Sequence, residues 1–331
     1  MKSMEFDMAI IGGGCIGSSI AAELSRRGFR NAVLIDQGRS TQSATASSGG
    51  ILRVFHENLD HMELALNNLT HLKTYQEEEI LKEKNQFNGS LYFFASHRLK
   101  SFEKNFHYLE SKNYPFEILN SDTGSERFPD FLWSKNQLAV YEPLGSHLSP
   151  LQFATDLLNF SQNSGLTLVD DFSVERFCFF RDRYKIFSSD AVITAKTLIL
   201  AGGARLVPQM KDLGISDTLS IESLKIYRSS KPNTDFQLPN YFDRENLEFA
   251  RLGHGSEIIL SHLKSQRLLN VSWNESSFTE ITANDCYSPN RQGAAGFLMG
   301  HPRLLLATGW GGTAFKFALE IGHRIGNLFY V

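Results

Sequence analysis

The feature that most constrains the fold of this chain is a glycine cluster near its start, AIIGGGCIGSSIAAELSRRG at residues 9–28. Gly12, Gly14 and Gly17 have the G-x-G-x-x-G spacing of a turn that binds a dinucleotide. An apolar run precedes the cluster, and apolar residues at helical spacing follow it. The order is therefore strand, turn and helix, which predicts the first unit of a parallel α/β sheet.

Each glycine of this turn has a physical task. Gly12 permits the tight turn, Gly14 lets a diphosphate approach the backbone, and Gly17 allows the helix to pack closely against the strand. Cys15 and Ile16 begin the helix, whose unpaired N–H groups and partial positive charge attract an anion. A glycine-rich turn without a ligand is the alternative.

An acidic residue stands where such a site needs one. The run Ala32-Val33-Leu34-Ile35 ends at Asp36, about 20 residues after Gly17, where a carboxylate accepts hydrogen bonds from the ribose of an adenosine. The same carboxylate would repel a 2′-phosphate, which disfavours NADP. We place Gln37, the next residue, in the same site. The loop at 39–50, RSTQSATASSGG, offers hydroxyl and backbone groups that could line a polar ligand, or it is a solvated turn.

Bulk composition excludes several classes of protein. The chain has 331 residues, a formal net charge of −3, and 42% hydrophobic and 21% charged residues, which is ordinary for a globular protein. This charge gives no reason to expect nucleic acid. No apolar stretch reaches the ~18 residues of a membrane span, so we expect no membrane partner. The opening MKSMEFDM lacks a signal-peptide pattern, and we expect a cytoplasmic protein. The sequence does not predict the oligomeric state.

Metal and disulfide chemistry are not expected either. Cys15, Cys178 and Cys286 are far apart and have no C-x-x-C spacing. The histidines lack the spacing of a helical metal site. We therefore predict no metal.

The two ends of the chain share one pattern. A strand at 303–307, a glycine turn at 309–312 and a helix at 314–329 repeat the order seen at the start. Between about 219 and 290 the sequence is mostly extended, as in an antiparallel sheet. Three further helices are predicted, at 59–84, 99–112 and 149–164. We predict a discontinuous cofactor domain at 1–85, 140–215 and 290–331, and a second domain at 86–139 and 216–289.

An ordered series of motifs spans nearly the whole chain. It comprises IIGGGCIG with Asp36, SSGGILR ending at Arg53, ERFPDF at 126–131, EPLGSHLSP at 142–150, ILAGG at 199–203, KIYRS at 225–229, CYSP at 286–289 and TGWGGTAFKFALEIG at 308–322. In this order and spacing the series resembles the FAD-dependent amine and amino acid oxidoreductases, the family of monomeric sarcosine oxidase, glycine oxidase and D-amino acid oxidase.

The resemblance implies an α/β fold in which a Rossmann-like FAD-binding domain is interleaved with an antiparallel-sheet substrate domain. It implies FAD bound in an extended form. It also implies oxidation of a C–N bond of a small amine, in which the carbon that bears the amine transfers a hydride to the flavin and an imine forms. The electron acceptor would be O₂ or another oxidant. Beyond the first turn and Asp36, the positions that the resemblance places at FAD are Ser47, Ser48, Gly49, Gly50, Arg53, Val174, Ala201, Gly202, Gly203, Cys286, Gly309, Gly311, Gly312, Thr313, Ala314 and Lys316.

Three residues are candidates for catalysis. Lys316 matches a lysine that pairs with the substrate carboxylate in sarcosine oxidase-like members, although a helical lysine is usually exposed. His56 stands where that pattern has a second carboxylate-binding arginine, and a neutral imidazole would hold a carboxylate less firmly. His262 could border the flavin, and a structural role is equally consistent with its position. Glu257 falls near the place of the family lysine that assists oxygen, and Lys264 is out of register.

Other departures leave the substrate open. Cys286 resembles the residue that attaches flavin covalently in some members, but the spacing after it is one residue short, so covalent FAD is not favoured over a buried inert thiol. The chain is shorter than typical members by roughly 40 to 60 residues, mainly between Trp273 and Cys286, which suggests a shortened substrate domain. The alternatives are a tailoring enzyme for a bulky, peptide-, nucleoside- or carrier-bound amine, and a flavin-binding subunit with little turnover.

Overall fold

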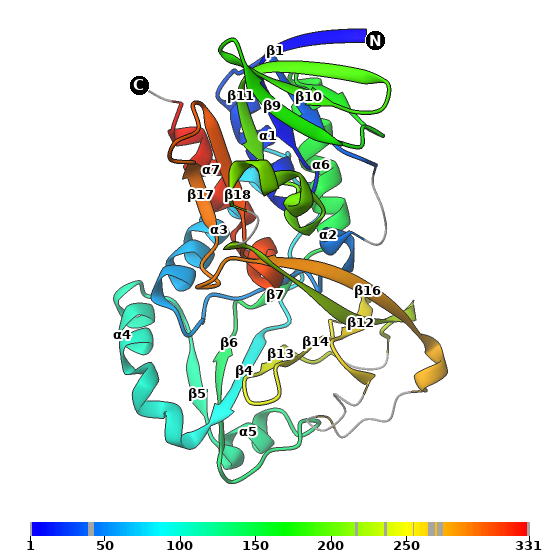
Figure 1. Cartoon of the computed structure of the whole chain (residues 1–331). Coiled ribbons are helices and arrows are strands. Elements are labelled where there is room, and N and C mark those ends of the chain that lie inside the picture. The colour runs from blue at the N-terminus through cyan, green and yellow to red at the C-terminus, as the bar shows by residue number, and fades with distance from the viewer. Residues whose placement is uncertain are drawn as a thin grey trace.

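The chain forms two halves, each built around one eight-stranded sheet in the part that the structure describes (Figure 1). The structure is a computed structural model that describes residues 2–38, 43–215, 218–234, 237–253, 255–263, 269 and 274–329. The first and the last described elements of the chain lie in the same half, as the sequence predicts. Among the described helices, none is both long and apolar enough to cross a lipid bilayer.

The first sheet contains the predicted parallel core. Its order is β17-β18-β11-β1-β2-β8, with β10 on β11 and β9 on β10. Strand β11 pairs in parallel with β1 on one side and β18 on the other, so the two ends of the chain meet across one strand. The strands are β1 (Lys2–Ile11), β2 (Ala32–Ile35), β8 (Thr167–Val169), β9 (Arg176–Phe180), β10 (Arg183–Phe187), β11 (Ala191–Leu200), β17 (Ala294–Phe297) and β18 (Leu304–Thr308).

Four helices flank this sheet: α1 (Cys15–Arg26), α3 (Leu59–Glu77), α6 (Pro150–Asn163) and α7 (Ala318–Asn327). Helix α1 is almost wholly buried, and α6 and α7 pack against it. A Cβ on Gly322 of α7 would lie 2.7 Å from the carbonyl oxygen of Ser19 in α1, so glycine allows the two helices to touch. The α/β fold class is confirmed by this arrangement.

Two helices end or begin differently from the sequence prediction. The helix over 59–84 ends at Glu77, because Glu79 takes a left-handed φ of 56° and turns Ile80 and Leu81 into the core. The helix over 314–329 is divided into a 3₁₀ turn, η6 (Gly311–Phe317), and α7. Phe317 has a φ of −119° at the junction and is fully buried, so packing of its ring interrupts the α-helix. The helix over 149–164 is confirmed.

The second sheet has the order β16-β12-β15-β14-β13-β4-β6-β5 and is antiparallel except for β13 on β4. Its strands are β4 (Ser90–Ala95), β5 (Glu117–Leu119), β6 (Gln137–Glu142), β12 (Ser220–Pro232), β13 (Asn240–Asp243), β14 (Glu248–Arg251), β15 (Glu257–Leu260) and β16 (Phe278–Tyr287). Helices η1 (Ser96–Phe102), α4 (Glu103–Ser111), α5 (Ser121–Arg127) and η5 (Glu275–Ser277) belong to this half. An aromatic core lies behind β4.

Short elements connect the halves. Strand β3 (Ile51–Leu52) pairs with β7 (Ser146–His147), and α2 (Ala44–Ser47) and η2 (Gly203–Leu213) contact β16. In Figure 1 the long strands β12 and β16 of the second sheet run across the middle of the molecule, next to the first half. Strand β6 crosses the domain boundary placed at residue 140, and the domain limits stay a prediction.

Candidate functional site

A cavity of about 340 Å³ lies between the start of α1, the end of β2 and the carboxyl-terminal glycine turn. It brings together most of the positions predicted to bind cofactor. The predicted residues that line it are Gly12, Gly14, Cys15, Ile16, Asp36, Gln37, Val174, Ala201, Gly202, Gly203, Cys286, Gly309, Gly311 and Ala314. The predicted residues outside this lining are Gly17, Ser47, Ser48, Gly49, Gly50, Arg53, Gly312, Thr313 and Lys316.

The first glycine turn has no room for side chains. Gly12 has a φ of +108°, and a Cβ there would lie 2.6 Å from the Cα of Gly202. A Cβ on Gly17 would lie 1.8 Å from the carbonyl oxygen of Gly12. Gly14 precedes α1 and provides no side-chain cap. The Thr45 hydroxyl of α2 accepts the Cys15 N–H at 3.0 Å, so an anion at the start of this helix would lie beside that hydroxyl or displace it.

Asp36 is held by the turn that it faces. Its Oδ2 accepts a hydrogen bond from the Gly13 N–H at 2.6 Å, and its Oδ1 accepts one from Gly38 at 3.0 Å. Burial raises the pKa of Asp36, and these two N–H groups oppose the rise. Arg205, which also lines the cavity and was not predicted, adds positive charge near the carboxylate. The arrangement suits an acceptor for hydroxyl groups.

Two arginines of the second sheet hold the segment that contains Ser47, Ser48, Gly49 and Gly50. Arg228 donates to the carbonyl oxygen of Ala46 at 2.6 Å, and Arg251 donates to that of Gly49 at 3.4 Å. Gly50 has a φ of +65°, and a Cβ there would lie 2.0 Å from the Leu148 carbonyl oxygen. The segment is therefore fixed by long-range contacts. Arg228 occurs in the quoted motif KIYRS, whereas nothing in the sequence indicated Arg251.

Glu257 completes this cluster. It lies 3.4 Å from Arg228 and 3.8 Å from Arg251. At the position where the resemblance has a lysine, this chain thus has a carboxylate with two guanidinium groups beside it. Residues 39–42, Lys264 and Trp273 lie outside the described residues.

Arg53 is buried with aromatic rings around its guanidinium. The charged group lies 4.9 Å from the ring centre of Tyr92 and 5.3 Å from that of Phe242, and it donates to the carbonyl oxygen of Phe55. Burial lowers the pKa of Arg53, and Tyr92 and Glu142 oppose the change. Glu142 is fully buried on β6 and provides the nearby countercharge. It begins the motif EPLGSHLSP, but sequence reasoning did not predict this role.

Lys316, His56 and His61 form a second group beside Arg53. Lys316 is half-buried on η6, and loss of hydration, with Arg53 nearby, lowers its pKa to about 7. The ring of His56 is buried, 5.5 Å from the Phe317 ring and 5.8 Å from the His61 ring. Burial, then Arg53 and Lys316, hold the pKa of His56 well below its usual value, and burial also lowers that of His61.

Both imidazoles are therefore neutral at pH 7. Their Nε2 atoms are buried and have no hydrogen-bond partner within the described ranges. The structure thus brings Arg53, His56 and Lys316 together, and it adds His61, which sequence reasoning missed although it lies near His56 in sequence. His262 is not part of the group, since it follows β15 and its ring lies 6.5 Å from that of Tyr227 on β12.

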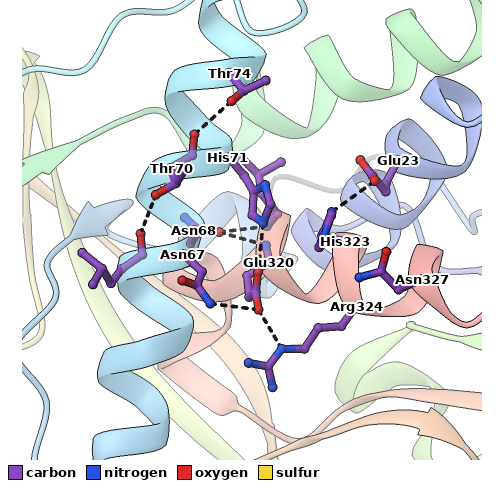
Figure 2. Close-up of polar contacts among 12 residues, drawn as sticks. Glu23, Asn67, Asn68, Thr70, His71, Thr74, Glu320, His323, Arg324 and Asn327 are labelled. Carbon is purple, nitrogen blue, oxygen red and sulfur yellow. Dashed lines mark hydrogen bonds and ion pairs between the residues drawn. The ribbon is translucent and has the colours of Figure 1, made fainter. Parts of the chain in front are cut away.

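A polar network fixes the helix that follows Lys316 (Figure 2). Asn68 on α3 accepts hydrogen bonds from the backbone N–H groups of Leu319 and Glu320, at 2.9 and 3.5 Å, which caps the start of α7. His71 contacts the Glu320 carboxylate at 2.9 Å. Because Lys316 lies just before α7, these contacts also position its backbone.

The same network ties α7 to α1. His323 lies 3.3 Å from the carboxylate of Glu23, as Figure 2 shows, and Glu23 accepts a hydrogen bond from the Tyr75 hydroxyl at 2.8 Å. Arg27 donates to the same carboxylate at 2.7 Å. Burial raises the pKa of Glu23, but hydrogen bonds from Arg27, Tyr75 and Arg26 outweigh it and lower that pKa to about 2. The helix that begins at the first glycine turn and the helix that follows Lys316 are thus locked together.

The carboxyl-terminal turn closes the cavity from the other side. Gly311 has a φ of +52°, and a Cβ there would lie 1.9 Å from the ring of Tyr287. The Gly312 N–H donates to the Tyr287 hydroxyl at 3.3 Å, and the Thr313 hydroxyl donates to the Trp310 carbonyl oxygen at 2.7 Å. Trp310 and Asp285 line the cavity, and neither was predicted.

The two buried thiols of the site are poorly reactive. Burial raises the pKa of Cys15 to about 11. Burial also raises the pKa of Cys286, with a further rise from Asp285, while a contact with Thr308 opposes it. Within the described residues, no group of three or more histidine, cysteine or acidic side chains could hold a metal ion.

Comparison with a family model identifies the class of protein. The model of the FAD dependent oxidoreductases (DAO) matches residues 7–240 of this chain. The chain belongs to this family of FAD-dependent oxidoreductases, as the motifs of the sequence predicted.

Several solved structures share the fold of this chain. The L-proline dehydrogenase from P. horikoshii has a TM-score of 0.83 at 16% identity and covers 99% of this chain and 94% of that one. Glycine oxidase from Geobacillus kaustophilus has a TM-score of 0.82 at 16% identity, and the match covers 98% of this chain and 94% of that one. NikD is described as an unusual amino acid oxidase essential for nikkomycin biosynthesis. It has a TM-score of 0.80 at 18% identity, and the match covers 98% of this chain and 93% of that one. At these identities the likeness shows the shared fold.

Curated relatives match a part of this chain. Mitochondrial dimethylglycine dehydrogenase of Rattus norvegicus is 24% identical over 168 residues, which are 49% of this chain. The match spans only 19% of that relative, about one fifth of its length. The expected shortening is small against the solved structures, since 94% of the proline dehydrogenase and of the glycine oxidase is covered.

The residues of the cavity fit the cofactor of the family. The turn at Gly12, which leaves no room for side chains, and the start of α1, where the neutral Thr45 hydroxyl accepts one N–H, suit a diphosphate, and the Asp36 carboxylate suits a ribose. The partners already present on Asp36 are backbone N–H groups, which leave lone pairs for further hydrogen bonds. The donor set therefore matches the adenosine diphosphate part of FAD.

Proposed function

We propose that this protein oxidises the C–N bond of an amine or amino acid by hydride transfer to FAD, giving an imine. The observation that carries the proposal is the half-buried Lys316 beside Arg53 and two neutral histidines, close to the FAD-fitting cavity. Bound FAD would supply the electron sink. Several proteins with this fold carry the names of amino acid oxidases and dehydrogenases.

In this proposal each part of the site has one task. The turn at Gly12 and Gly14 and the start of α1 hold the diphosphate, and Asp36 binds the ribose. The segment 47–50, held by Arg228 and Arg251, and the turn at 309–314 border the rest of the cofactor. Arg53 supplies fixed positive charge, and its aromatic surroundings exclude water from it. The substrate would meet Lys316 and His56.

Lys316 would bind an anionic group of the substrate. With a pKa of about 7 the amine is only partly protonated at neutral pH, and a carboxylate placed beside it would favour the ammonium form. The bound carboxylate then fixes the distance and direction of the neighbouring carbon that loses hydride. His56 would contribute a neutral hydrogen bond rather than a second charge.

A second candidate is a tailoring enzyme that acts on a bulky or carrier-bound amine. The observation that favours it is the neutral imidazole of His56, which stands where the resemblance has an arginine, with the neutral imidazole of His61 beside it. One cation holds a small amino acid carboxylate less firmly than two. A larger amine would compensate by burying more of its own surface. NikD, which shares the fold, is named for a role in nikkomycin biosynthesis.

We propose that FAD is held without a covalent bond. Attack on the flavin needs the thiolate of Cys286, and burial and Asp285 both disfavour that form. Precipitation of the purified protein with acid tests this point: yellow colour should leave with the supernatant. Colour retained in the pellet of wild type but lost in Cys286→Ser would establish a thioether instead.

Anaerobic titration of the purified yellow protein tests the function. Sarcosine, glycine, proline and D-amino acids form one panel, and N-alkylated peptides and nucleosides form another; bleaching of the flavin absorbance is the readout. We expect one panel to bleach the wild type and Lys316→Met to need at least tenfold more substrate. Lys73→Met, an exposed lysine of α3, is the matched control and should behave as wild type. If no amine bleaches the flavin, the low-turnover subunit is the better description.

Admission of air after bleaching identifies the electron acceptor. Recolouring with one peroxide per flavin indicates O₂, and slow recolouring that is accelerated by an added dye or quinone indicates another acceptor. The cytoplasmic location stays a prediction.

A further inference from the structure

Asp285 places a carboxylate inside the cavity proposed for FAD. It lies on β16 and lines the same cavity as Gly14 and Gly311. A Cβ on Gly312 would lie 3.4 Å from its Oδ2 atom, so the carboxylate faces the carboxyl-terminal glycine turn. The side chain is half-buried. An acid in this place is unexpected, because the cofactor that fits here is itself an anion.

Little positive charge compensates this carboxylate. Within the described part of the chain, Asp285 forms no ion pair with an arginine, lysine or histidine. Its hydrogen-bond partner is the Tyr287 hydroxyl at 3.5 Å. Directly across the β12–β16 ladder stands Glu222, whose own carboxylate pairs with Arg291 at 2.5 Å. The titratable groups that face Asp285 are Tyr287 and Cys286 of β16, Glu222 of β12, Cys15 of α1 and Lys316 of η6.

A diphosphate and an ionised Asp285 in one cavity would repel each other. Like charges that share a poorly hydrated site ionise together only at a high free-energy cost, and the usual escape is that one of them binds a proton. We propose that Asp285 takes up a proton when FAD binds, so that a neutral carboxylic acid faces the bound cofactor. The inference rests on the proposed placement of FAD in this cavity.

The direction of the pH effect follows from the free protein. Burial raises the pKa of Asp285 to about 6, while Tyr287 and Lys316 oppose the rise. Below pH 6 the acid is protonated before and after FAD binds, so FAD binding does not change the protonation state of Asp285. Above pH 6 each binding event must take up a proton, and FAD affinity falls by up to tenfold per pH unit until the pKa of the complex is passed.

Lys316 gives an effect of the same sign and must be separated from it. Its pKa of about 7 means that its positive charge, which attracts an anion, is lost over the neighbouring pH range. The two residues differ in the charge of their ionised forms. Ionised Asp285 is negative and repels FAD, whereas ionised Lys316 is positive and attracts it. Removal of its charge should therefore strengthen FAD binding at high pH, whereas removal of the Lys316 charge should weaken FAD binding at low pH.

Calorimetry of FAD binding to the full-length protein, stripped of cofactor, provides the test. Titrations from pH 5.5 to 8.5, each in two buffers with different heats of ionisation, give the dissociation constant and the protons taken up. For the wild type we expect at least tenfold weaker binding at pH 8 than at pH 5.5, with net proton uptake at pH 7. Asp285→Asn should bind FAD more tightly than the wild type at pH 8 and should keep only the pH dependence that Lys316 causes. Lys316→Met should keep the step that belongs to Asp285.

Glu280→Gln is the matched control, because it removes an exposed acid of the same strand that does not face Asp285, and it should leave proton uptake unchanged. The proposal is wrong if wild type takes up no proton at pH 7, or if Asp285→Asn keeps the wild-type slope. Because Lys316 also takes up a proton when an anion binds nearby, the proton count on Lys316→Met gives an answer even if Asp285→Asn fails to fold. Because the readout is FAD binding, the result does not depend on whether any amine is oxidised.

Discussion

The Oε1 atom of Glu142 accepts a hydrogen bond from the backbone N–H of Val54, 2.6 Å away and 88 residues apart in sequence. The same oxygen accepts the N–H of Phe55 at 3.0 Å. Glu142 is fully buried, and its charge lies near the guanidinium of Arg53. One carboxylate thus fixes the backbone between Arg53 and His56 and provides a buried countercharge.

Replacement of Glu142 tests this relationship. Glu142→Ala leaves two buried N–H groups and a buried guanidinium without their partner, and we expect it to lower the free energy of unfolding by about 3–5 kcal/mol. Glu142→Gln keeps an acceptor oxygen but not the charge, and should cost about 1–3 kcal/mol. Urea unfolding gives both values. Glu126→Ala, an exposed acid, is the control; equal stability of all variants would show that Glu142 does not hold this segment.

The binding of an amino acid substrate should weaken as pH rises through the pKa of Lys316. That pKa is lowered to about 7 by burial and by Arg53, so the ammonium form is complete below pH 6 and lost above pH 8. We expect the dissociation constant of a carboxylate-bearing ligand to rise about tenfold between pH 6.5 and 8.5. The corresponding methyl ester should show no such step. A carboxylate ligand that binds equally at both pH values would exclude Lys316 as its partner.

Gly17 is predicted to tolerate no side chain. A Cβ there would lie 1.8 Å from the Gly12 carbonyl oxygen, which belongs to backbone and cannot move without opening the turn. We therefore expect Gly17→Ala to lose FAD and to lower the melting temperature by ten degrees or more. Gly28→Ala is the comparison, since its Cβ would meet nothing within 4 Å and only its φ of +86° is unfavourable. Absorbance at 450 nm after gel filtration and a thermal melt distinguish the two variants.

The sequence predicted those parts of the fold and site that depend on local constraints. The turn at Gly12 and Gly17, the helix after it and the acid at the end of β2 are set by residues within one short stretch. The meeting of the chain ends across β11 followed from the repeated strand, turn and helix. Ser149-Pro150 likewise marked the start of α6, where the Ser149 hydroxyl accepts the N–H of Gln152.

Contacts between distant segments could not be predicted in this way. The hydrogen bond between Arg251 and Gly49 joins residues that are 202 positions apart, and the one between Glu142 and Val54 joins residues that are 88 positions apart. A single sequence carries no pattern for such pairs. The end of α3 at Glu77 was missed for a related reason: burial of Ile80 and Leu81 outweighs the helix propensity of the glutamates before them.

Asn68 should position Lys316 without touching it. Its Oδ1 caps α7 through the N–H groups of Leu319 and Glu320, as Figure 2 shows. Asn68→Ala should cost about 1–2 kcal/mol of stability and let the turn before α7 fray, so that a carboxylate ligand binds several-fold more weakly while its methyl ester is unaffected. Asn68→Asp keeps the acceptor oxygen and should restore ligand binding. Asn67→Ala, next in the chain but bonded to the Glu320 side chain rather than to the backbone of α7, is the control. If Asn68→Ala weakens the acid and the ester equally, the cap supports the fold as a whole and not Lys316 in particular.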